Sequence, residues 1–124
     1  MSPSRYRDRI AELAREAERA TAEFDPPDDP PDEQRARRLL RDGFGPALSV
    51  YIEARSGEWE RFGESEFADL ERAMNDWLEL YAACYGVDME SNVTVRKAAE
   101  ALIDTHNVYD VARILTSVPE RGED

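Results

Sequence analysis

The strongest constraint on the fold is an apolar stripe through residues 65–85. Its members recur at alternating spacings of three and four residues, on one face of an α-helix: Phe67, Leu70, Met74, Trp77, Tyr81 and Cys84. Ser65 is expected to cap this helix, and Gly86 follows where a left-handed residue commonly ends one. Glu71 is expected on the exposed side. A face this broad and aromatic requires burial, which predicts that residues 65–85 form the central helix of the core.

A second, narrower stripe predicts an N-terminal helix within residues 1–24. Its apolar residues follow the heptad spacing of four and three: Tyr6, Ile10, Leu13, Ala17, Ala20 and Phe24. Ser2 or Ser4 is expected to cap the helix, and Pro3 suits its first turn. The stripe is rich in alanine, so this helix requires a partner surface, either in this chain or on another chain.

Residues 25–32 read Asp-Pro-Pro-Asp twice in succession. Proline fixes φ and disfavours helix in the residue before it, so the helices on both sides must stop here. We expect a stiff polyproline II spacer of roughly 25 Å, long enough to carry the chain back alongside the first helix. A rigid connector is a better interpretation than a recognition peptide, because Pro-rich ligands usually carry basic flanks.

Two helices are predicted directly after the spacer. Asp32 is placed to cap the first of them, which has Ala36, Leu39 and Leu40 as its apolar face. The sequence Gly-Phe-Gly-Pro at residues 43–46 is expected to interrupt it, and Pro46 suits the first position of the next helix. That helix is expected to end at Ser56.

Two further helices are predicted in the C-terminal part. Thr94 is placed to cap the first, whose expected inward residues are Val95, Ala98, Ala99, Leu102 and Ile103. Asn107 and Asp110 have the spacing of a capping box and should open the second, which Pro119 ends.

The predicted organisation is a single all-α domain over residues 1–124. A helical core over residues 33–119 follows the N-terminal helix and the spacer, and residues 120–124 form an acidic tail. Because no segment alternates between apolar and polar residues as a strand does, the fold is expected to be a bundle of five or six helices.

The excess of acidic residues indicates the kind of solvent in which the protein works. The chain holds 28 acidic and 16 basic residues, with a net charge of −12, and Lys97 is its only lysine. Carboxylates retain water and hydrated cations, and molar salt shortens the Debye length to about 3 Å, so their mutual repulsion is screened there. This composition resembles that of small acidic cytoplasmic proteins from salt-accumulating haloarchaea. The longest apolar stretch, Leu80 to Val87, is far shorter than the ~18 residues that span a bilayer, so we expect a soluble cytoplasmic protein that does not enter a membrane.

Few residues suit catalysis or metal binding. One histidine, His106, and one cysteine, Cys84, cannot supply the four ligands of a structural zinc site, and we expect no metal, cofactor or enzyme activity. His106 lies near Asp104 in a predicted turn and could act as a general base. A hydrogen-bonding turn residue is the stronger interpretation, because no nucleophile lies beside it. Cys84 lies on the apolar stripe and is expected to be a small core residue.

Protein–protein interaction is the favoured function, as an adaptor or regulatory subunit that binds a protein partner or a second copy. Two kinds of residue are candidates for partner contact. The apolar candidates are Ile10 and Leu13 of the N-terminal helix, with Trp59 and Phe62 in a polar loop, since aromatic residues are favoured at interfaces. The basic candidates are Arg35, Arg38 and Arg41, which share one helical face in the only net-positive segment. Pairing of these arginines with acidic residues of the same chain is the simpler interpretation of the basic face.

A nucleic-acid-binding regulator is the alternative function. Residues 94–115 resemble a DNA-binding helix-turn-helix, with Ala98, Val108 and Val111 at inward positions. The segment departs from that pattern at Leu102, where the tight turn usually places Gly, so a plain helical hairpin is the simpler interpretation. The resemblance implies nucleic-acid contacts from a small set of residues: Arg96, Lys97, Asn107 and Arg113.

Overall fold

The computed structural model describes residues 6–56 and 64–118. Its elements, in chain order, are α1 (Arg7–Glu23), α2 (Glu33–Leu39), the π-helix η1 (Leu40–Phe44), α3 (Gly45–Ser56), α4 (Glu64–Ala83), α5 (Val95–Thr105) and α6 (Val108–Thr116). No strand occurs in these two stretches. The predicted all-α class and helical bundle are therefore confirmed.

Helix α4 lies at the centre of the fold and packs against every other described helix. The predicted stripe is buried apart from Phe67, which is partly exposed. Gly86 has the expected left-handed conformation, with φ of 79°. The prediction that Ser65 caps the helix is wrong, because α4 already begins at Glu64 and Ser65 lies within its first turn.

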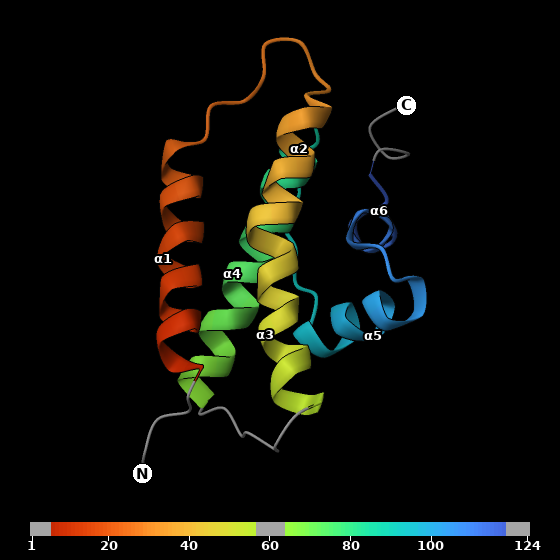
Figure 1. Cartoon of the computed structure of the whole chain (residues 1–124). Helices are drawn as coiled ribbons and strands as arrows, with labels where there is room; N and C mark the ends of the chain where they lie inside the picture. The colour runs from red at the N-terminus through yellow and green to blue at the C-terminus, as the bar shows by residue number, and fades with distance from the viewer. Residues whose placement is uncertain (1–5, 57–63, 119–124) are drawn as a thin grey trace.

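Helices α1 and α4 run in one direction, and the α2–η1–α3 segment runs in the opposite direction (Figure 1). Helix α1 begins at Arg7, and Tyr6 precedes it without a side-chain cap. The expected caps Ser2 and Ser4 lie outside the described residues. The apolar stripe of α1 packs mainly on α4, so the partner surface that this helix requires is in its own chain.

The Asp/Pro spacer crosses one end of the bundle from the end of α1 to the start of α2 (Figure 1). Its expected path back alongside α1 is therefore wrong, because α2, η1 and α3 make that return instead. The N–H of Asp32 donates to the Cys84 carbonyl at 2.8 Å, which fixes the spacer to the end of α4. Arg35 donates to the Asp25 carbonyl at 2.6 Å, and its guanidinium lies 4.2 Å from the centre of the Phe24 ring.

The chain stays helical from α2 through η1 into α3, so the predicted interruption at residues 43–46 is wrong. The N–H of Gly45 donates to the Leu40 carbonyl, five residues earlier, which is the π-helical pattern. Pro46 has no N–H, and its ring needs room in the preceding turn. The wider π-helical turn accommodates the proline where an α-helix would kink. The predicted Asp32 cap is confirmed, because its carboxylate accepts the Arg35 N–H at 3.2 Å.

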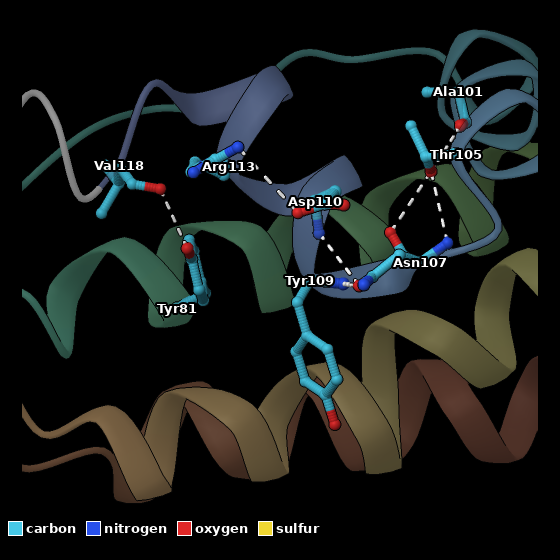
Figure 2. Close-up of polar contacts among 8 residues, drawn as sticks. All are labelled: Tyr81, Ala101, Thr105, Asn107, Tyr109, Asp110, Arg113 and Val118. Carbon is cyan, nitrogen blue, oxygen red and sulfur yellow. Dashed lines mark hydrogen bonds and ion pairs between the residues drawn. The ribbon is translucent and has the colours of Figure 1, made fainter.

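The caps of α5 and α6 follow the sequence closely. Thr94 accepts the Lys97 N–H at 3.1 Å, as predicted. Asn107 caps α6 by accepting the N–H groups of Tyr109 and Asp110 at 2.9 and 3.3 Å (Figure 2). The capping box forms only in this half, because the Asn107 N–H donates to the Thr105 hydroxyl at 3.3 Å instead of to Asp110.

Two predicted positions in this hairpin need correction. Ile103, expected to point inward, is 57% exposed, because the buried face of α5 centres on Val95, Ala98 and Ala99. Helix α6 was expected to end at Pro119, but it already ends at Thr116. The next residue, Ser117, adopts a left-handed conformation with φ of 60°.

Three polar side chains of α4, spaced four residues apart, hold the segment that leads into α5. Glu71 accepts the Val95 N–H at 2.9 Å, and so caps the first residue of α5. Asn75 both accepts from the Val93 N–H and donates to its carbonyl, each at 2.9 Å. Glu79, one turn further along, accepts another backbone N–H of this segment at 2.9 Å. The expectation that Glu71 lies free on the exposed side is therefore wrong.

Replacing Glu71 by alanine should lower the free energy of unfolding by about 1–2 kcal/mol, because the partly buried Val95 N–H loses its acceptor. Urea denaturation followed by circular dichroism will measure the change. The control is Glu100→Ala, which removes an exposed pair with Arg96 and should change stability by no more than about 0.5 kcal/mol. Equal losses from the two variants would mean that the α4 contact contributes no more than a surface ion pair.

Candidate functional site

The apolar residues of α1 are not available to a partner. Ile10 is 1% exposed and Leu13 is 9% exposed, and both belong to the core that α1 forms with α4. This corrects the expectation that they form the contact surface, because side chains buried within their own chain offer no area to another protein. The two loop aromatics of the same hypothesis, Trp59 and Phe62, lie outside the described residues.

Of the three arginines of the expected basic face, two are engaged by groups of the same chain and one is not. Arg35 holds the spacer through its bond to the Asp25 carbonyl. Arg41 pairs with the neighbouring Asp42 at 3.1 Å, and both side chains are exposed. Arg38 opens into a surface groove between α1 and η1, which we call the α1–η1 groove. Its lining includes Glu16, Ala20, Arg38, Leu39, Gly43 and Trp77.

Exposed large apolar side chains gather on the α5–α6 hairpin, residues 95–116. Ile103 is 57% exposed and Ile114 is 58% exposed, with Tyr109 also exposed, and no other large apolar side chain in the described residues is as open. Sequence reasoning missed Ile114. The signal was available, because Ile114 lies off the helical face that Val111 and Leu115 define.

The same hairpin is electrically neutral in a chain of net charge −12. Its charged residues form three basic and three acidic groups: Arg96, Lys97, Arg113, Glu100, Asp104 and Asp110. All of the net negative charge therefore lies elsewhere. A second acidic protein meets less repulsion at this hairpin than at the rest of the surface.

The residues expected to contact nucleic acid occupy this hairpin, but most are engaged locally. The side-chain oxygen of Asn107 is used in capping α6, and Arg113 lies 4.0 Å from Asp110 (Figure 2). Arg96 pairs with Glu100 at 3.2 Å. Lys97 lies exposed in the first turn of α5. The two helices and their short connection resemble a helix-turn-helix in spacing, with few polar side chains left to read bases.

Comparison with known protein families matches residues 4–120 to a domain of unknown function (DUF8055). The chain belongs to the DUF8055 family. No curated protein and no solved structure matches the sequence. In the part of the DUF8055 domain that the structure describes, no helix combines the length and the apolar character needed to cross a membrane.

The cysteine and the histidine of this DUF8055 domain, the residues best suited to nucleophilic or acid–base chemistry, differ in exposure. Cys84 is fully buried, and burial raises the pKa of its thiol to about 11, as fits a core residue. His106 is an exposed residue in a left-handed turn, with φ of 56°, and its N–H donates to the Leu102 carbonyl at 2.7 Å. Among the described residues, no three potential ligands gather closely enough to hold a metal ion.

Proposed function

We propose that this DUF8055 protein acts by protein–protein contact, as an adaptor or regulatory subunit, and that the α5–α6 hairpin is its contact surface. One observation carries the proposal: the most exposed large apolar side chains of the described residues, Ile103 and Ile114, lie on this hairpin. Because each isoleucine is only a little more than half exposed, it forgoes roughly 1–2 kcal/mol relative to full burial. Burial against a partner recovers that free energy.

The partner we propose is another acidic protein, a class that includes a second copy of this chain. The neutral charge of the hairpin supports this choice, because two proteins of strongly negative charge repel each other least where one of them is neutral. We further propose that the contact forms in a salt-rich cytoplasm, where the Debye length is about 3 Å and the remaining repulsion is screened.

The test compares the wild-type protein with the double variant Ile103→Asp, Ile114→Asp. The matched control is Ala22→Asp, Ala68→Asp, which adds the same charge at exposed positions of α1 and α4. Sedimentation velocity in KCl of about 1–3 M detects self-association while surface charges are screened. Affinity capture from a high-salt lysate, with all three proteins as bait, detects other partners.

We expect the wild type and the control to form the same stoichiometric complex, and the hairpin variant to weaken it about 100-fold or more, because charges replace two buried apolar anchors. Identical complexes for all three proteins, or none for the wild type, would refute the proposal. A DNA complex that Arg96→Ala, Lys97→Ala weakens, with a flatter salt dependence, would establish nucleic-acid binding instead.

A further inference from the structure

Helix α1, which forms one wall of the α1–η1 groove, lies on the opposite side of the α2–η1–α3 segment from α5 and α6 (Figure 1). The groove has a volume of about 380 Å³. That volume lies within the range of small-molecule sites, roughly 300–1,000 Å³. Apolar groups contributed by Ala20, Leu39 and Trp77 line it, and charged side chains surround them. An apolar lining with a few polar groups is the usual make-up of a small-ligand site.

The indole of Trp77 brings an unused hydrogen-bond donor to this groove. Trp77 is only 3% exposed, and its Nε1–H makes no hydrogen bond with any described residue. Every fully buried side-chain nitrogen or oxygen in the described chain has a hydrogen-bond partner, so this unpaired nitrogen must touch solvent. The indole, Nε1 included, lies against Gly43, and both residues line the groove.

Gly43 is the residue that lets the indole lie there. A Cβ at this position would come within 3.0 Å of three indole atoms, including Nε1, which is closer than real side chains pack. Any other residue at position 43 would push the ring away from η1. The close approach of the indole to the η1 backbone thus fixes the position of the ring beside the groove.

The charged groups around the groove divide into engaged and unengaged ones. Arg35 is held by the Asp25 carbonyl, and Asp42 pairs with Arg41. Two other lining groups, Arg38 of α2 and Glu16 of α1, form no ion pair with any described residue. Arg38 and Glu16 therefore offer one cation and one anion without an ion-pair partner among the described residues, and Arg35 adds a second positive charge that is held by a neutral carbonyl.

We propose that the α1–η1 groove binds a free amino acid, whose carboxylate is held by Arg38 and the Trp77 N–H and whose ammonium is held by Glu16. Arginine holds carboxylates in a planar, two-point contact, and an indole N–H supplies a third donor. A ligand with only one charge leaves either Arg38 or Glu16 without a counter-charge. The side chain of the amino acid lies on Ala20 and Leu39, which favours apolar amino acids. This site is independent of the protein contact at the α5–α6 hairpin.

The experiment titrates the full chain with each of the twenty common L-amino acids in molar KCl. Nitrogen-15 NMR follows the Trp77 Nε1–H resonance, which is distinguished from that of Trp59 with a Trp59→Phe variant. Isothermal calorimetry measures the affinity of each ligand that shifts the resonance. For each bound amino acid, the matching amine without a carboxylate and the matching acid without an ammonium group are tested as well.

We expect at least one apolar amino acid to bind with a millimolar or tighter dissociation constant and to shift the Trp77 resonance. Arg38→Gln and Glu16→Gln should each weaken binding about 10-fold or more, because a charged hydrogen bond is lost. Trp77→Phe, which removes the N–H and keeps an aromatic ring, should weaken it too. Arg96→Gln is the matched control and should leave the affinity unchanged, because Arg96 lies exposed on α5, where it pairs with Glu100 and does not line the groove.

Two results would overturn the proposal. One is the absence of any shift of the Trp77 resonance by the twenty amino acids at about 10 mM, ten times the dissociation constant at the weak limit. The other is equal binding of the amino acid and its singly charged analogues, because recognition then does not use both Arg38 and Glu16. Circular dichroism checks that the Trp77→Phe protein is folded, so that lost binding does not reflect unfolding.

Discussion

Replacing Trp77 by alanine should lower the free energy of unfolding by about 3–5 kcal/mol, the usual range for removing a large aromatic side chain from a core. Trp77 is 3% exposed and lies on α4, the helix that contacts all the other described helices. Its removal leaves a cavity beside η1, where the neighbouring Gly43 has no side chain to fill it. Urea denaturation in molar KCl, followed by circular dichroism, measures the loss.

Substitution of Gly43 provides the control for this prediction, because it tests whether the indole packs on the backbone at position 43. Gly43→Ala alone should cost about 1–3 kcal/mol, because its Cβ overlaps the indole and the core must shift. In the Trp77→Ala background the same change should cost much less, because the methyl group enters the vacated space. Additive losses in this double-mutant cycle would show that the two residues do not share a contact.

Much of the fold could be predicted because local rules agreed with the tertiary structure. Residues three and four apart lie on one face of any α-helix. This spacing alone therefore assigns Leu70, Met74 and Trp77 of α4 to the core, without knowledge of what packs against them. The caps at Asp32 and Thr94 follow in the same way, because a cap acts within three residues of its own position.

The remainder depends on contacts between distant segments, which local patterns do not encode. Residues 43–46 carry two glycines and a proline, and these usually break a helix. Here the π-helical turn and the Trp77 ring make the same residues part of a continuous helical segment. Glu71 looked like a surface carboxylate in a chain with many of them, and only the path of residues 91–95 gives it a buried partner.

The candidate sites were harder to predict than the core for the same reason. An apolar residue in a helix says which face seeks burial, but not whether this chain or another one buries it. Ile10 and Ile103 illustrate the two outcomes, because α4 covers the first and no described element covers the second. The α1–η1 groove combines residues from α1, α2, η1 and α4, and no sequence spacing relates them.

The acidic surface leads to the second large effect, which is a dependence of stability on salt. The net charge is −12, and only one ion pair among the described residues joins two separate helices, Arg9 with Glu53 at 2.8 Å. The unfavourable effect of crowded carboxylates is seen at Asp76. Burial raises the pKa of its carboxyl group, and the neighbouring carboxylates Glu79 and Glu18 raise it further. Repulsion of this kind opposes folding wherever it is not screened.

We expect the thermal midpoint to rise by roughly 10 °C between about 0.1 M and 3 M KCl, the rise that a stabilisation of about 2 kcal/mol gives a domain of this size. Asp76→Asn should raise the thermal midpoint by part of this amount in dilute buffer and by less in molar KCl, because salt already screens the repulsion of Asp76 by Glu79 and Glu18.

The direction of the pH dependence follows from the same carboxyl group. The folded-state pKa of Asp76 lies above the unfolded value, so its contribution to stability grows as the pH falls through that raised pKa. Differential scanning fluorimetry across the salt series measures these shifts, and a midpoint that stays constant from dilute to molar KCl would contradict adaptation of this surface to a salt-rich cytoplasm.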